Sequence, residues 1–199
     1  MNREFWNERY GAAEYIYGTE PNVFFRQQLE LLPPGRLLLP AEGEGRNAVF
    51  AAAAGWEVDA FDQSEAGQHK ARQLAGQRGV QIRYRILDIR DMDYPAGAFG
   101  AVGLIYAHMP AALRAAFHLR IQELLAPGGL LILEGFSKDQ LQFQSGGPKD
   151  PAMLFSPEEL QAEFSGMEIL MLNQLHTELQ EGTYHAGTAS VVRMLARRA

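Results

Sequence analysis

The sequence contains no cysteine among its 199 residues. This absence excludes disulfide bonds, thiolate metal ligands and a cysteine nucleophile. Positive charge is also scarce, because 18 Lys and Arg residues face 24 Asp and Glu residues and leave a net charge of −6. A chain with this balance lacks the basic footprint that binding to nucleic acid or to an anionic membrane requires. We therefore expect neither nucleic acid nor a membrane as a partner.

Long hydrophobic runs are missing as well. No window approaches 18 uninterrupted apolar residues, so no transmembrane helix is expected. The first nine residues lack the apolar core of a signal peptide. A composition of 47% hydrophobic and 21% charged residues is typical of a globular protein, and 199 residues suit one domain of ordinary size. We predict a cytoplasmic protein with a single domain over residues 1–199.

The most informative segment is a short apolar run, a tight turn and the start of a helix over residues 37–47. The turn holds Gly43 and Gly45, and an alanine-rich segment follows from Asn47. The glycines let a ligand approach the backbone and tolerate positive φ, while the helix start presents unpaired N–H groups. The turn is therefore predicted to bind a polar ligand. Residues 43–48 also satisfy the loose dinucleotide pattern GxGxxA, so the turn alone leaves the ligand open.

Strand and helix signals alternate along the middle of the chain. Strands are predicted at residues 37–39, 56–61, 81–87, 101–106 and 130–136, with helices at 46–54, 64–75 and 110–125 and a turn at 126–129. A helix at 22–32 precedes them. After an irregular stretch at 137–155 come a helix from the capping box at Ser156 and an antiparallel hairpin of strands 167–179 and 183–196. This order predicts a doubly wound α/β fold with a mostly parallel, seven-stranded sheet and a C-terminal antiparallel hairpin.

This organisation divides the chain into three parts. Residues 1–36 form an aromatic N-terminal cap, residues 37–136 a cofactor-binding core, and residues 137–199 a substrate-side loop, helix and hairpin. The aromatic arm either covers a ligand or packs on the sheet, and packing is the better default.

Two carboxylates follow predicted strands, at the sheet edge where open α/β folds bind ligands. Asp62 lies 19 residues after Gly43, the spacing at which a carboxylate accepts hydrogen bonds from ribose hydroxyls. Its alternative is a turn aspartate at a strand end. Asp88 could accept a hydrogen bond from an adenine amino group, with Ile89 in apolar contact, or could simply cap a turn.

These elements resemble the class I S-adenosylmethionine-dependent methyltransferases, and more narrowly the tellurite-resistance and thiopurine methyltransferase-like group. The resemblance covers nearly the whole chain and is carried by residues 42–48 (EGEGRNA), 61–64 (FDQS), 87–89 (LDI) and 125–129 (LAPGG), and by 5–10 (FWNERY) and 17–22 (YGTEPN) in the cap. The final hairpin matches the added antiparallel strand of that family, which a dinucleotide dehydrogenase domain would not need.

The resemblance implies S-adenosyl-L-methionine as cofactor and a Rossmann-like methyltransferase fold. The cofactor-binding residues that it implies are Glu42, Gly43, Gly45, Arg46, Asn47, Asp62, Gln63, Asp88, Ile89 and Tyr106. The chain departs from the family pattern in its first motif, which usually begins with an acidic residue where Leu39 and Ala41 stand here. Glu42 or backbone carbonyls are therefore expected to hold the methionyl amino group. Gly100 also replaces an aspartate usual in the family, a change expected to affect packing more than chemistry.

The methyl acceptor is expected to be a small nucleophile such as a thiol, a selenium or a tellurium species. Substrate-side candidates are Tyr10, Tyr17, Arg26, Glu134, Tyr184 and His185, and the catalytic candidates are His108 and Tyr106. His108 is the preferred general base, because an unperturbed histidine titrates near neutrality, although any single histidine can instead be a packed residue. No metal is predicted, because His176 and His185 would not lie opposite each other across the hairpin.

Two alternatives to a small-molecule methyltransferase remain. The altered first motif would permit a noncatalytic module that binds S-adenosylmethionine or S-adenosylhomocysteine, and the GxGxxA pattern would permit an NAD-dependent oxidoreductase. The acidic charge argues against RNA or DNA as methyl acceptor. The sequence leaves the oligomeric state open.

Overall fold

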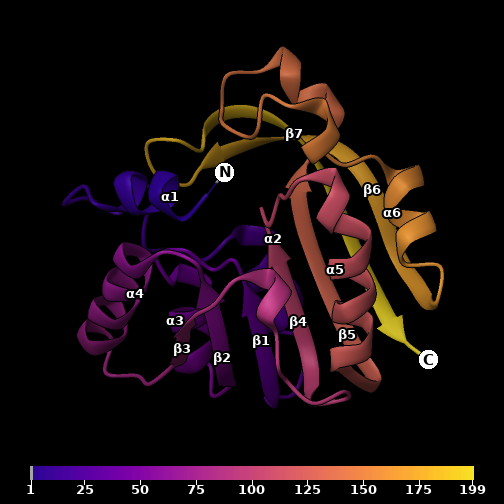
Figure 1. The fold of residues 1–199 in the computed structure, drawn as a ribbon, viewed down its shortest axis with the longest axis horizontal. Coiled ribbons are helices and arrows are strands. Elements are labelled where there is room, and N and C mark those ends of the chain that lie inside the picture. Colours follow the sequence, from indigo (N-terminus) through magenta and orange to yellow (C-terminus); the bar gives the residue numbers. More distant parts are fainter. Residues whose placement is uncertain (1) are drawn as a thin grey trace.

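A seven-stranded sheet forms the centre of the computed structural model, which describes residues 2–199 (Figure 1). Met1, the first residue of the predicted cap, lies outside the described residues. The strands are β1 (Arg36–Pro40), β2 (Glu57–Asp62), β3 (Arg83–Ile86), β4 (Phe99–Ile105), β5 (Leu125–Phe136), β6 (Met167–Gln180) and β7 (Ala186–Arg198). They lie in the order β3-β2-β1-β4-β5-β7-β6. β1 to β5 are parallel and β7 is antiparallel to both β5 and β6, which confirms the predicted fold class.

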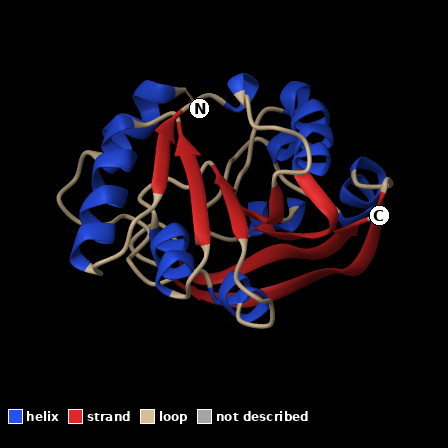
Figure 2. Cartoon of the chain, turned by 90° about the horizontal axis from the view of Figure 1, so that it is seen from below, coloured by secondary structure: helices blue, strands red, loops and turns tan. Residues whose placement is uncertain are grey.

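Helices cover both faces of this sheet (Figure 2). They are α1 (Arg3–Tyr10), α2 (Val23–Leu29), α3 (Arg46–Ala53), α4 (Glu65–Gln77), α5 (Ala111–Leu124) and α6 (Pro157–Glu163), with short 3₁₀ turns η1 (Ile89–Asp91), η2 (Lys138–Gln142) and η3 (Pro151–Met153). α5 and α6 contribute to the core on one face, and α2, α3 and α4 to the core on the other. None of the helices in residues 2–199 has both the length and the apolarity that a membrane span needs.

The central strand β1 shows why the sequence folds in this way. Leu38 packs into the core beneath α5, whereas Leu37 and Leu39 pack into the core beneath α2 and α3. Successive residues of a strand point to opposite faces of the sheet, and helices cover both faces here. All three side chains are therefore fully buried. An uninterrupted apolar run is the pattern that a strand covered on both faces requires.

Several element boundaries differ from the predictions by a few residues, and two of these differences have a clear structural reason. The helix predicted at residues 22–32 begins after Asn22, whose side chain accepts from the N–H of Phe25 at 2.9 Å, and it already ends at Leu29. The predicted turn at residues 126–129 is instead the irregular first part of β5. Phe99 pairs with Leu125 and the register then shifts, so the residues between form a bulge within the strand.

The C-terminal third has the predicted helix and hairpin. Ser156 caps α6, accepting at its side-chain oxygen from the N–H of Glu159 at 3.3 Å, as the capping box predicted. The stretch predicted to be irregular contains η2 and η3. β6 and β7 are joined by residues 181–185, and this tip reaches over the strand ends towards α1 (Figure 1). Gly182 packs so closely against the cap loop at Tyr17 that a side chain there has no room.

Candidate active site

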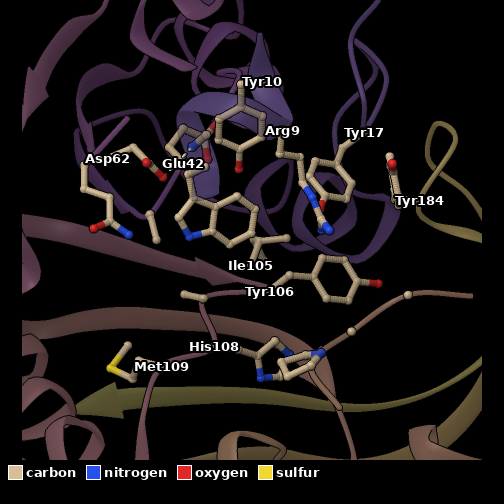
Figure 3. Close-up of a pocket in the computed structure, with 18 of the residues that line it drawn as sticks. Arg9, Tyr10, Tyr17, Glu42, Asp62, Ile105, Tyr106, His108, Met109 and Tyr184 are labelled. Carbon is tan, nitrogen blue, oxygen red and sulfur yellow. Dashed lines mark hydrogen bonds between the residues drawn. The ribbon is translucent and has the colours of Figure 1, made fainter. Parts of the chain in front are cut away.

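A cavity of about 820 Å³ lies at the carboxyl ends of the parallel strands, beneath α1 and the tip of the β6–β7 hairpin. Asp62 and Glu42 stand towards one end of it and Tyr17 and Tyr184 towards the other (Figure 3). Most of the predicted site residues line it: Tyr10, Tyr17, Glu42, Gly43, Arg46, Asn47, Asp62, Gln63, Asp88, Ile89, Tyr106, His108, Tyr184 and His185. Gly45, Arg26 and Glu134 do not contribute to its wall.

The glycine turn is held by close packing on both sides. Gly43 has a φ of 60°, and a Cβ there would lie 2.6 Å from the hydroxyl of Tyr10. Gly45 has a φ of 87°, and a Cβ there would lie 2.5 Å from the Cβ of Ala71 on α4. Only glycine meets both requirements, a positive φ and no side chain. Gly43 lets the cap approach the loop, whereas Gly45 allows the contact between α3 and α4 and does not line the cavity.

Glu42 is anchored by the start of α3. Its Oε1 accepts from the N–H of Ala48 at 2.7 Å, and its Oε2 accepts from the side-chain amide of Asn47 at 3.4 Å. Burial raises the pKa of Glu42 to about 7, against these hydrogen bonds, which favour ionisation. The carboxyl group is therefore poised between its neutral and charged forms, and a cationic ligand group would favour the charged one.

Asp62 joins the end of β2 to the glycine turn. Its Oδ2 accepts from the N–H of Gly43 at 3.2 Å, and its Oδ1 accepts from the N–H of Ser64 at 2.9 Å. Burial raises the pKa of Asp62 to about 6. Because an ionised carboxylate has about four acceptor positions, both oxygens can still accept from hydroxyl groups of a ligand.

Asp88 occupies the position that was predicted for an adenine contact. Its Oδ1 accepts from the N–H of Arg90 at 2.9 Å and so caps η1, and both oxygens accept from the Arg90 guanidinium at 2.8 Å. Hydrogen bonding to Arg90 lowers the pKa of Asp88. The side chain of Asp88 thus caps a turn, which was the predicted alternative to an adenine contact. Asp88 and Ile89 nevertheless line the cavity.

Tyr106 stands at the end of β4 in an uncommon conformation. Its φ is 52°, which non-glycine residues seldom adopt and which often marks a functional position. The hydroxyl donates to Oε1 of Glu134 at 3.0 Å. Burial, together with the charge of Glu134, raises the pKa of Tyr106 well above its ordinary value. The phenol is therefore neutral and is held by Glu134.

Glu134 supports the site from behind, which corrects its prediction as a substrate-side residue. It is buried, and its carboxylate accepts from the amide of Asn22 at 2.6 Å, from Tyr106 and from Arg193. These bonds connect the cap to β5 and β7. Arg26 is likewise corrected, because Phe24 and Phe25 occupy the buried face of α2 and leave Arg26 exposed to solvent.

His108 lies in the cavity wall, but its ring is fixed by the backbone. Nδ1 is 2.8 Å from the carbonyl oxygen of Met153, and Nε2 accepts from the N–H of Phe136 at 2.9 Å. Burial lowers the pKa of His108 to about 4. Both nitrogens of the neutral ring are therefore engaged, with Nδ1 donating and Nε2 accepting. This geometry corrects the prediction that His108 is the general base.

The hairpin tip supplies Glu181, a site residue that was not among the sequence predictions. Glu181 is buried, and its Oε2 accepts from Nη2 of Arg46 at 2.8 Å while its Oε1 accepts from the amide of Asn22 at 2.9 Å. Burial opposes the ionisation of Glu181, but the neighbouring ring of His185 and the charge of Arg46 lower its pKa to about 2. A charged residue in a turn gives no periodic signal of burial, so no pattern in the sequence marked it.

Two basic side chains of the cavity wall were also missed. Arg9 and Lys149 form no salt bridge within residues 2–199, whereas Arg46 and Arg90 each pair with a carboxylate. Arg9 donates to the hydroxyl of Tyr17 at 3.1 Å, and its guanidinium lies 4.7 Å from the ring centre of Tyr184. A cation beside an aromatic helix face, as in the segment FWNERY, is the signal that could have identified Arg9.

No metal site is formed by clustered His, Asp and Glu side chains anywhere in residues 2–199. His176 pairs with Ser190 across the hairpin, and His185 lies beyond the paired residues at the tip. The two histidines are therefore not opposed, as the sequence indicated.

Comparisons with known proteins agree with this geometry. Residues 40–129 match the model of a family described as a methyltransferase domain. Over 192 residues the chain is 25% identical to a thiopurine S-methyltransferase from Vibrio atlanticus (strain LGP32), covering 87% of this chain and 86% of that protein. The family match includes the glycine turn, Asp62 and Asp88.

Solved structures share the fold at low identity. TehB from Haemophilus influenzae superposes with a TM-score of 0.74 at 16% identity, covering 99% of this chain and 67% of that one. The 1,6-didemethyltoxoflavin-N1-methyltransferase of Burkholderia thailandensis, solved with 1,6-didemethyltoxoflavin and S-adenosylhomocysteine bound, gives a TM-score of 0.64 at 20% identity, covering 89% of this chain and 79% of that one.

The comparisons support an enzyme rather than a noncatalytic module, and they support S-adenosylmethionine rather than NAD as the cofactor. Together with the fold, they support an S-adenosylmethionine-dependent methyltransferase, and the chain is similar to class I enzymes of the thiopurine methyltransferase and TehB type.

Proposed function

We propose that this methyltransferase transfers a methyl group to a small, negatively charged molecule with a soft nucleophilic atom, most simply a thiol. The observation that carries this proposal is that two cations of the cavity wall, Arg9 and Lys149, form no salt bridge within residues 2–199, and that Arg9 lies among aromatic rings. In a chain with a net charge of −6, basic side chains usually find carboxylate partners. Two basic side chains that line a cavity and have no carboxylate partner favour the binding of an anionic ligand.

The residues at the other end of the cavity fit S-adenosylmethionine. The carboxylate of Asp62 has acceptor capacity for the two ribose hydroxyls, and Glu42 can accept from the methionyl amino group. Nη1 of Arg46 is buried without a hydrogen-bond partner in residues 2–199, and it would hold the cofactor carboxylate. This unpartnered Nη1 indicates that the residues of the cavity wall fit a ligand with a carboxylate, as S-adenosylmethionine has. These assignments, with Gln63, Asn47, Asp88 and Ile89 beside them, remain proposals.

When bound, S-adenosylmethionine supplies an electrophilic methyl group on a sulfonium. The protein's part is to orient the acceptor, to exclude water and to remove a proton where the acceptor carries one. The cap closes one side: the rings of Trp6 and Tyr10 are stacked with centres 5.3 Å apart, and Tyr10 rests on the glycine turn. The hairpin tip closes the other side with Tyr184 and His185.

The size and chemistry of the cavity favour a small acceptor. Its volume lies within the range of small-molecule sites, and its walls come from α1, the strand ends and the hairpin tip. Tyr10, Tyr17, Tyr106 and Tyr184 provide ring faces for a planar acceptor. The Vibrio relative is by its name an S-methyltransferase, which supports sulfur as the acceptor atom.

The test is methyl transfer to a panel of aromatic thiols matched for thiol pKa, one with a ring carboxylate and one without. We expect turnover of the carboxylate-bearing thiol, with a KM that rises about tenfold in Arg9→Gln and in Lys149→Gln, about 1.4 kcal/mol of lost binding. The KM of the neutral thiol should not change. Arg72→Gln, which removes a cation of α4 outside the cavity, is the matched control.

Equal effects of Arg9→Gln on the neutral and the charged thiol would overturn the assignment of an anionic acceptor. Failure of wild-type protein to methylate any thiol, selenol or tellurium acceptor would overturn the choice of acceptor atom. A cytoplasmic location and the absence of a nucleic acid partner stay predictions from the sequence.

A further inference from the structure

His185 is the histidine of the cavity wall whose ring nitrogens have no hydrogen bond to the backbone. It lies at the hairpin tip, 6% exposed, between the rings of Tyr17 and Tyr106, with centres 4.5 and 4.4 Å away. Nδ1 is buried without a hydrogen-bond partner in residues 2–199 and lies 3.5 Å from Oε2 of Glu181. Phe136 packs edge-on against the ring. The imidazole is therefore fixed in position by ring packing, and its nitrogens form no hydrogen bond with the backbone.

The carboxylate of Glu181 lies beside one ring nitrogen of His185 and so biases which of the two nitrogens carries the proton. Glu181 is itself held by Arg46 and Asn22, so its Oε2 is a fixed acceptor beside Nδ1. A carboxylate beside one ring nitrogen favours the tautomer with hydrogen on that nitrogen. The Nε2 lone pair is then available to the cavity, which His185 lines.

The groups around His185 keep it neutral in the free enzyme. Burial lowers its pKa, Glu181 raises it, and the positive charges of Arg46 and Arg9 lower it further. The neighbouring phenols of Tyr17 and Tyr106 are neutral, because burial raises the pKa of each. His108 packs nearby and is also neutral. A neutral imidazole with a free lone pair is a proton acceptor.

We propose that His185 is the general base that removes the proton from the methyl acceptor, and that Glu181 is the positioning residue that orients its ring. This inference rests on the proposed function, because it requires an acceptor that carries a proton. It assigns to the hairpin tip the role that the sequence analysis gave to His108.

The reaction breaks the S–H bond of the acceptor and the bond between the methyl group and the sulfonium, and it forms one new carbon–sulfur bond. The acceptor's S–H proton passes to Nε2 of His185, and the electron pair left on sulfur forms the bond to the methyl group as the old carbon–sulfur bond gives its pair to the leaving thioether. The imidazolium then carries one positive charge beside the negative charge of Glu181, which stabilises it. The proton leaves to water after the product departs, and the starting state is restored.

Other groups in the wall are less suited to this step. Both ring nitrogens of His108 are bonded to the backbone. Tyr106 donates to Glu134 and its raised pKa keeps it protonated. Glu42 lies at the cofactor end of the cavity, where Ala48 and Asn47 anchor it away from Tyr17 and Tyr184 (Figure 3).

The first test measures the acceptor rather than turnover. A carboxylate-bearing aromatic thiol is bound to enzyme loaded with S-adenosylhomocysteine, and its thiolate absorbance is followed against pH. We expect the apparent pKa of the bound thiol in His185→Gln to lie above that in wild type by about one unit, a tenfold loss of thiolate at neutral pH. His176→Gln, an exposed histidine on the same hairpin, should leave this pKa unchanged.

The second test uses thiols of graded acidity. His185→Gln should lower kcat/KM by about 100-fold for thiols that are protonated at the assay pH, and much less for thiols that are already ionised. Glu181→Gln should lower it less and shift the pH profile, and Glu181→Asp should restore part of the loss. Unchanged affinity for S-adenosylhomocysteine and unchanged thermal unfolding would confirm that His185→Gln is folded.

Nitrogen NMR of the ring is independent of any acceptor. In the free enzyme His185 should show hydrogen on Nδ1, and Glu181→Gln should redistribute it. Turnover by wild type with an equal rate and thiolate pKa in His185→Gln would sink the inference while leaving the proposed function intact. Absence of thiol turnover in wild type would instead sink the proposed function, and a ring protonated on Nε2 would sink the inference by itself.

Discussion

Arg46 donates from Nη2 to Oε2 of Glu181 across 2.8 Å, and this buried ion pair ties the first turn of α3 to the hairpin tip. The pair joins the two ends of the cavity, because Arg46 follows the glycine turn and Glu181 lies beside His185. The glycine turn and the hairpin tip are 135 residues apart in sequence. The proposed cofactor site and the proposed acceptor site are thus joined by one ion pair.

Removing one partner of this pair should destabilise the fold. We expect Arg46→Met to lower the free energy of unfolding by about 3–5 kcal/mol at pH 7, because Glu181 is left as a buried charge with less compensation. The double variant Arg46→Met/Glu181→Leu should recover part of this loss, since it removes both charges. Urea unfolding of the single and double variants measures the difference, and a double variant no more stable than Arg46→Met would contradict the coupling.

The same pair predicts a pH dependence of stability. The pKa of Glu181 is about 2 in the folded protein and 4.5 is its ordinary value, so its ionisation stabilises the fold above pH 4.5. This contribution is lost as the pH falls from 4.5 towards 2. The gap in stability between wild type and Arg46→Met should therefore be constant from pH 5 to 8 and narrow below 4.5. A gap that widens on acidification would show that another group dominates.

Asp62 is predicted to contribute to cofactor affinity. Asp62→Asn places an amide beside the N–H groups of Gly43 and Ser64 and removes acceptor capacity from the ribose site. We expect S-adenosylhomocysteine to bind about 10- to 100-fold more weakly, corresponding to about 1–3 kcal/mol, as measured by calorimetry. Asp59→Asn is the matched control on the same strand, where the carboxylate pairs with Arg83 away from the cavity. Equal affinity of both variants and wild type would remove Asp62 from the site.

The strand ends were predictable from the sequence because they depend on local pattern. Gly43, Asp62 and Asp88 follow short apolar runs, and parallel strands bring their carboxyl ends to one edge. The fold class follows from the same alternation. The roles within that edge were less predictable: Asp88 caps its own turn, and Gly45 serves helix packing.

The acceptor end was not predictable in the same way, because it depends on contacts between distant segments. The position of His108 after β4 predicts a base, yet the backbone groups of Phe136 and Met153 engage both nitrogens of its ring. His185 was one of several candidates, and its selection needs the burial of Glu181 against Arg46 and Asn22. No periodicity encodes where a hairpin tip comes to rest.

Glu42 is predicted to make cofactor binding depend on pH. Its pKa is about 7 in the free protein, and the cationic methionyl amino group would stabilise the charged form and so lower that pKa. Binding then releases a proton below pH 7, and affinity for S-adenosylhomocysteine should rise about fivefold from pH 6 to 7 and level off by about pH 8, because it follows the ionised fraction of Glu42. Calorimetry in buffers of different ionisation enthalpy measures the released proton.

The Glu42→Gln variant should abolish this dependence near pH 7. A weaker dependence near pH 6 should persist, because burial also raises the pKa of Asp62 to about 6. Glu20→Gln, on an exposed carboxylate of the cap, is the control and should bind as wild type does. Retention of the full pH dependence in Glu42→Gln would show that Glu42 does not contact the amino group.

Substitutions at two glycines of α4 distinguish the effect of backbone freedom from the effect of packing against the glycine turn. A Cβ at Gly67 would lie 2.9 Å from the carbonyl oxygen of Gly43 and 3.1 Å from the ring of Tyr10, whereas a Cβ at Gly76 meets nothing within 4 Å. We expect Gly76→Ala to stabilise the protein by about 0.4–1 kcal/mol, because alanine restricts the unfolded chain. Gly67→Ala should destabilise it by about 1–3 kcal/mol and weaken S-adenosylhomocysteine binding, because the glycine turn must move. Thermal unfolding and calorimetry on both variants test this prediction. Stabilisation by Gly67→Ala equal to that by Gly76→Ala would show that the cap, α4 and the glycine turn do not form a tight contact at this end of the cavity.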